Sequence, residues 1–160
     1  MSIATPKYQQ TRWSLADLCS APESPDLEAA FTQLDQIAGE FEAFRPSLTA
    51  DIPDEKFMQV LHKLEDIQDL GSRLYGYAGL LYTEDTQNQT AQSLNARVEQ
   101  FVAELDNRTL FFRLWWRELD DENAARLMAA AGDLEYWLEA LRAFKPHTLS
   151  EPEEKIINIK

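Results

Sequence analysis

Two stretches of the sequence decide the fold: LYGYAGLLYTEDTQNQ at residues 74–89 and NRTLFFRLWWRELDDE at residues 107–122. Apolar residues recur at helical spacing along the two segments that contain these stretches. Glu84-Asp85-Thr86 separates the two helical patterns. We expect Asp85 or Thr86 to cap the second helix, which should run to about Leu119. Two long antiparallel helices joined by so short a turn form a helical hairpin.

Shorter helices are predicted on both sides of this hairpin. Their boundaries are marked by capping residues, prolines and a glycine, at Ser24-Pro25, Arg45-Pro46, Asp51-Ile52-Pro53, Asp120, Gly132-Asp133, Lys145-Pro146 and Ser150-Glu151-Pro152-Glu153. The sequence shows no strand-like alternation of polar and apolar residues. We therefore predict an all-α fold, a helical bundle built around the long antiparallel hairpin.

Three segments are expected along the chain. Residues 1–25 form an N-terminal arm with a short helix capped by Ser14, and residues 26–148 form the helical domain. Residues 149–160 begin a helix that we expect to lead into a catalytic domain missing from this sequence. Within the hairpin, Gly71, Gly76 and Gly79 predict a bend or a closely approaching neighbour, because glycine is costly inside a helix.

Charge and composition exclude several classes of function. The net charge of −13, from 28 acidic and 15 basic residues, has the wrong sign for binding nucleic acid or an anionic membrane surface. The sequence has no run of about 18 apolar residues that would predict a membrane span. The single cysteine, Cys19, and the lack of a secretory signal predict a cytoplasmic protein.

No residue pattern predicts a catalytic or metal site. The HExxH motif of zinc peptidases is absent, and so is any Glu-x-x-His pair of the kind found in di-metal bundles. His62 is interpreted as a surface histidine and His147 as a loop histidine. The acids of Asp120-Asp121-Glu122 are interpreted as a helix start, and Cys19 as a structural thiol.

Seven apolar residues are the candidates for a surface between domains or facing a channel. Phe111, Phe112, Trp115 and Trp116 cover most of one helix circumference, so either all four belong to the core or some line a docking surface. The other three, Ile156, Ile157 and Ile159, follow a strong helix start near the end of the chain. If such surface lacks its partner, the chain could self-associate.

The sequence resembles the N-terminal region of oligoendopeptidase F-like zinc metallopeptidases. This resemblance covers essentially the whole chain, and its most specific parts are residues 77–82 (YAGLLY), 84–89 (EDTQNQ), 111–116 (FFRLWW) and 149–156 (LSEPEEKI). In the family, the HExxH helix and a further glutamate ligand lie far downstream and have no counterpart here. No catalytic or zinc-binding residue is therefore transferred to this chain.

The resemblance implies a role without chemistry of its own. The parent enzyme would hydrolyse short peptides with a zinc-activated water, and zinc would be bound by the parent alone. This region would form part of the wall of the substrate channel and contact the C-terminal catalytic domain of the same parent chain. The alternative is a free-standing, non-catalytic helical interaction module of the same ancestry.

Overall fold

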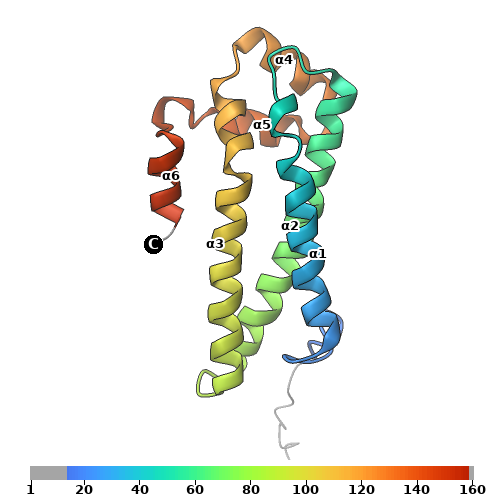
Figure 1. The fold of residues 1–160 in the computed structure, drawn as a ribbon, viewed down its shortest axis with the longest axis vertical. Coiled ribbons are helices and arrows are strands. Elements are labelled where there is room, and N and C mark those ends of the chain that lie inside the picture. The colour runs from blue at the N-terminus through green and yellow to red at the C-terminus, as the bar shows by residue number, and fades with distance from the viewer. Residues whose placement is uncertain (1–13, 159–160) are drawn as a thin grey trace, which may run out of the picture.

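A computed structural model describes residues 14–158 and shows six α-helices and, within that range, no strand (Figure 1). The predicted all-α fold is confirmed. Three short 3-10 helices connect the α-helices. The elements in chain order are α1 (Pro25–Glu42), η1 (Arg45–Ser47), α2 (Asp54–Glu84), α3 (Gln89–Glu118), α4 (Asp121–Ala130), η2 (Gly132–Leu134), α5 (Glu135–Arg142), η3 (Lys145–His147) and α6 (Glu151–Asn158).

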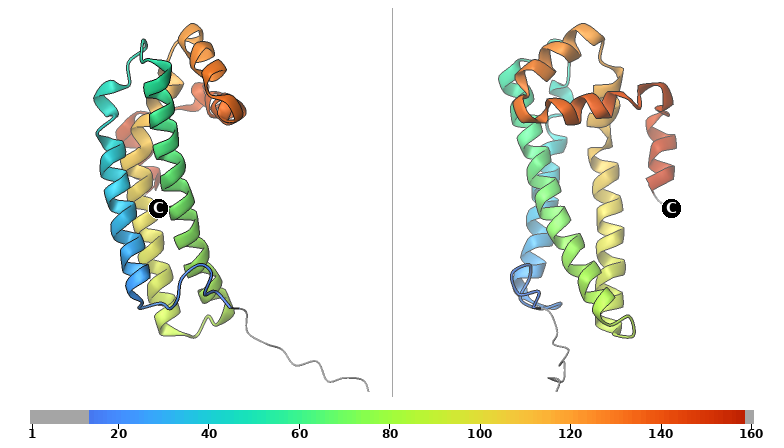
Figure 2. Two further views of the ribbon diagram at one scale, coloured as in Figure 1. Left: turned by 90° about the vertical axis from the view of Figure 1, so that its right-hand side faces the viewer. Right: turned by 180° about the vertical axis from the view of Figure 1, so that it is seen from behind.

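The predicted hairpin is formed by α2 and α3, and α1 packs along both of them (Figures 1 and 2). The cap of α3 differs from the prediction. Asn88 Oδ1 accepts the Ala91 N–H at 3.1 Å, whereas Asp85 Oδ1 accepts the Gln87 N–H at 3.0 Å. Asp85 therefore stabilises the turn itself, and the residue that caps α3 is Asn88, three residues after Asp85.

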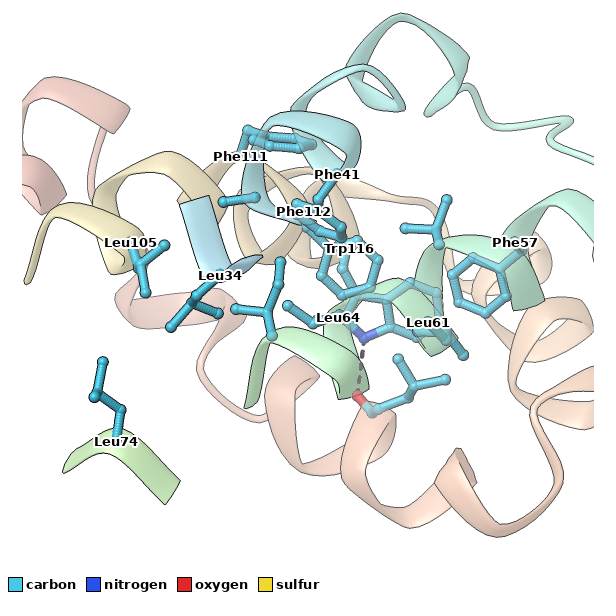
Figure 3. Close-up of a cluster of buried hydrophobic side chains, with 14 of the residues drawn as sticks. Leu34, Phe41, Phe57, Leu61, Leu64, Leu74, Leu105, Phe111, Phe112 and Trp116 are labelled. Carbon is cyan, nitrogen blue, oxygen red and sulfur yellow. Dashed lines mark hydrogen bonds between the residues drawn. The ribbon is translucent and has the colours of Figure 1, made fainter. Parts of the chain in front are cut away.

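The core lies between α1, α2 and α3, on the apolar stripes that their sequences carry (Figure 3). The largest fully buried side chains there include Phe41, Phe57, Phe112 and Trp116. The Phe57 ring stacks against both Phe112 and Trp116, with ring centres 6.4 Å and 5.6 Å away. Such aromatic pairs fix the register of α2 against α3.

Most of the predicted helix ends are observed. Pro25 opens α1, Asp120 Oδ1 caps α4 by accepting the Asn123 N–H, and Gly132 has the left-handed φ of 57° after α4. The expected cap at Asp133 is wrong, because Asp133 lies inside η2 and α5 begins at Glu135.

The segment before α1 forms a turn instead of the predicted short helix. Only one turn of helix-like bonding occurs, from the N–H groups of Leu18 and Cys19 to the Leu15 carbonyl. Arg73 of α2 donates to the Asp17 and Leu18 carbonyls and ties this turn to the bundle. The rest of the expected arm, residues 1–13, lies outside the described residues.

The glycines of α2 are not closely approached by neighbours. A Cβ atom at Gly76 or Gly79 would meet nothing within 4 Å, and at Gly71 it would make an ordinary contact of 3.9 Å with Leu34. The predicted close approach is therefore wrong. The curvature of α2 in Figures 1 and 2 agrees with the other half of that prediction, a bend.

The last two α-helices both contact α3. Helix α5 runs across the end of the bundle, and α6 turns back and lies beside α3 (Figure 2). The predicted final helix thus starts at Glu151, as expected, and packs on the hairpin over the length that the structure describes.

Candidate functional surface

The aromatic residues of α3 belong mostly to the core. The exposed fractions of Phe111, Phe112 and Trp116 are 6%, 0% and 0%, and Trp115 is half-buried. Trp116 Nε1 donates a hydrogen bond to the Leu138 carbonyl at 2.9 Å (Figure 3). The expected exposed aromatic patch is therefore wrong for these three residues, because α1, α2 and α5 together surround this part of α3.

Two of the three candidate isoleucines are exposed on α6. Ile156 and Ile157 are 62% and 54% exposed. Ile159 lies outside the described residues. Helix α6 has no buried residue at all, although it packs against α3.

Polar contacts attach α6 to the bundle. Arg45 Nη2 lies 2.7 Å from Glu151 Oε2, and Asn158 Nδ2 donates to Asn107 Oδ1 at 3.0 Å. Hydrogen bonds from Lys155 first, and then from Arg45, lower the pKa of Glu151. Helix α6 therefore presents its charged side to the bundle and two isoleucines to solvent, which is the reverse of the usual arrangement.

Arg117 is the most buried charge beside α6. Its guanidinium lies 3.8 Å from Glu154, and its Nε is buried without a hydrogen-bond partner among the described residues. Burial lowers the pKa of Arg117. This loose pair adds little attachment for α6, since one of its donors is left unsatisfied.

A cleft of about 370 Å³ opens between α2, α3 and α5. Its lining includes the buried side chains of Leu61 and Leu64 and the side chain of Trp137, which is 37% exposed. Charged residues of both signs line the remainder, among them Asp106 and Arg113 of α3. None of the cleft residues was predicted as a functional residue from the sequence.

The predicted surface histidine His62, loop histidine His147 and structural thiol Cys19 have ordinary surroundings. His62 Nδ1 lies 2.9 Å from Glu65, and His147 lies in η3. Cys19 is buried, with its Sγ donating to Asp26 Oδ2 at 3.4 Å. Hydrogen bonds from the Ser20 hydroxyl and N–H hold the pKa of Asp26 well below its usual range. Within residues 14–158 no three His, Cys, Asp or Glu side chains are grouped to hold a metal ion.

Comparison with known proteins adds one finding. The sequence model of the family described as Oligopeptidase F matches residues 115–160, the part of the chain from the end of α3 through α6. The predicted family resemblance is confirmed for these residues. They look like part of the N-terminal region of an oligopeptidase F-like peptidase. No curated protein and no solved structure matches the chain.

Among the described residues, no helix is long and apolar enough to cross a membrane.

Proposed function

We propose that this chain is the non-catalytic N-terminal helical region of an oligopeptidase F-like zinc peptidase and forms part of the wall of its substrate channel. The family match at residues 115–160 carries this proposal. The parent would act on short peptides, and we place it in the cytoplasm. The described residues offer no group of three metal ligands, so we assign the zinc, and every step of the hydrolysis, to other parts of the parent.

The outer side of α6 is the surface we propose for contact with the catalytic domain. Ile156 and Ile157 lie within the matched region and are more than half exposed. Leu149 and Phe144, on the approach to α6, are also exposed, at 45% and 56%. Burial of these four side chains against a second domain would stabilise the assembly by roughly 1.5–3 kcal/mol for each side chain that becomes fully buried.

The reading frame beyond Lys160 is the first test. An in-frame HExxH motif supports the proposal. A stop codon directly after Lys160 contradicts it and favours the free-standing interaction module instead. The isolated chain should show no turnover of a quenched peptide substrate, with or without added zinc, and turnover in a preparation free of other proteases would overturn the proposal.

The second test uses the complete parent. A double variant, Ile156→Asp with Ile157→Asp, should weaken the contact between the domains and lower peptidase turnover. The matched control is Tyr136→Asp on α5, because Tyr136 is 79% exposed and lies outside the proposed contact. Equal turnover in both variants and the wild type would contradict the proposed role of α6.

A further inference from the structure

Arg113, in the cleft between α2, α3 and α5, has no side-chain partner within the part of the chain that the structure describes. It makes no hydrogen bond or ion pair with any residue in the range 14–158. The seven other arginines in that range each make at least one, as for Arg108 with Asp35 and Glu42, and Arg142 with Asp121. The others are Arg45, Arg73, Arg97, Arg117 and Arg126. In a chain with 28 acidic residues, a half-buried guanidinium without a partner is free to bind a carboxylate from outside.

Two carboxylates of the same cleft also lack a partner in the described part of the chain. Asp69 of α2 and Asp106 of α3 line the cleft, and neither side chain has a partner among the described residues. Glu65, a third acid of the lining, already binds His62. The cleft therefore carries free groups of both signs, which have not neutralised each other.

The register of the hairpin separates these charges. The Phe57 ring of α2 lies against Phe112 of α3, next to Arg113. Asp106 lies six residues from Phe112 toward the hairpin turn, and Asp69 lies twelve residues from Phe57 in the same direction. Both acids are thus displaced from Arg113 toward the turn. The cleft has a positive end near α5 and a negative end farther along the hairpin.

The spacing of the charges fits a short peptide. Asp106 and Arg113 are seven residues apart on α3, which places them on the same helix face about 10 Å apart. An extended tripeptide spans about 10 Å. Trp137 and Leu141 of α5 line the cleft and provide apolar surface beside the positive end. A volume of about 370 Å³ lies within the range of small-ligand sites.

We propose that this cleft binds a short peptide with free termini and apolar side chains. The peptide carboxylate binds Arg113, the ammonium group binds Asp106, and an apolar side chain packs on Trp137. This inference goes beyond the proposed channel-wall role. It depends on the cleft alone and requires neither a second domain nor contact through α6.

Calorimetric titration of the chain with tri-leucine tests the proposal, with NMR used to follow the Trp137 indole N–H. We expect saturable binding and a shift of that signal. N-acetyl tri-leucine and tri-leucine amide, which each lack one terminal charge, should bind roughly tenfold more weakly or worse.

Variants then test the orientation of the peptide. Arg113→Gln should weaken binding of tri-leucine about tenfold and leave binding of the amide unchanged. Asp106→Asn should also weaken binding of tri-leucine about tenfold and should leave binding of the N-acetyl peptide unchanged. Glu104→Gln is the matched control, because Glu104 is an exposed acid of α3 outside the cleft. It should bind tri-leucine like the wild type.

Several results would overturn the proposal. These are no binding of tri-leucine by the folded wild-type chain, capped peptides that bind as well as the free peptide, or an effect of Glu104→Gln equal to that of Asp106→Asn. Thermal unfolding of each variant checks that it is folded, and the capped peptides test the wild type without any substitution. Failure here leaves the α6 experiments unaffected, since these use different residues.

Discussion

Helices α5 and α6 both pack against α3, but they are attached in different ways. Helix α5 buries Leu138 completely and accepts the Trp116 indole hydrogen bond. Helix α6 buries no residue and is attached by charged and amide side chains. Apolar burial is not screened by salt, whereas exposed ion pairs are weak and screened. We infer that α5 is an integral part of the fold and that α6 is its least firmly attached helix.

Truncation of one apolar residue on each helix should give the largest difference. Leu138→Ala should lower the free energy of unfolding by about 2–5 kcal/mol, because it opens a cavity in the core. Ile157→Ala should change it by less than about 0.5 kcal/mol, since the side chain is exposed. Urea unfolding followed by circular dichroism measures both values. Similar losses in the two variants would contradict the comparison.

The indole hydrogen bond can be removed while an aromatic ring is kept. Trp116→Phe should lower the free energy of unfolding by about 1–3 kcal/mol, because the variant loses the hydrogen bond to the Leu138 carbonyl and leaves space in the core. Trp115→Phe is the control, since Trp115 is only half-buried and its indole has no hydrogen bond to a described residue. Trp115→Phe should lower the free energy of unfolding clearly less in the same urea experiment.

The two helices also differ in the arginine that attaches each of them to the rest of the bundle. Arg142 donates to the Trp116 and Leu119 carbonyls at the end of α3, each at 2.9 Å, and is largely buried. Arg142→Gln should cost about 1–2 kcal/mol. Arg45, which pairs with Glu151 of α6, is 57% exposed, so Arg45→Gln should cost below about 1 kcal/mol and nothing measurable in 1 M salt. A salt-independent loss in Arg45→Gln would contradict the weak attachment of α6.

Acid should loosen α6 before α5. The pKa of Glu151 is lowered by its bonds from Lys155 and Arg45, and that of Glu153 by the hydrogen bonds from Ser150. A lowered pKa in the folded state means that the stabilisation is present above the ordinary glutamate pKa, about 4.3, and is lost as the pH falls through the folded value. Hydrogen exchange measured by NMR should show the α6 amides losing protection as the pH falls below about 4.3. Loss of protection in α5 at the same pH or higher would contradict the prediction.

The fold was largely predictable because its signals are local. Long apolar stripes identify α2 and α3, and prolines and caps mark helix starts such as Pro25 and Asp120. The start of α3 was missed because Asp85 and Asn88 are equally good capping residues in sequence. Only the three-dimensional turn assigns Asp85 to the loop and Asn88 to the helix.

The surfaces were harder to predict because they depend on contacts between distant segments. Burial of Trp116 requires α5 to cross the end of α3, and nothing near Trp116 in the sequence reports that crossing. Ile156 was singled out in the sequence as an apolar residue of the helix that starts at Glu151. The cleft was not, because its residues come from three helices, and because the absence of a partner for Arg113 is a property of the folded chain alone.

The buried position of Cys19 makes its reaction with a thiol reagent a measure of local opening of the segment before α1. This is the only thiol in the chain, and it is buried beneath the turn that Arg73 ties to α2. Cys19 is 8% exposed, so we expect a thiol reagent to react with it much faster when residues 15–24 separate from the bundle. The labelling rate at low denaturant therefore measures the free energy of that local opening, and the rate near the unfolding midpoint measures global unfolding. A single reagent thus distinguishes detachment of the N-terminal turn from loss of the whole fold.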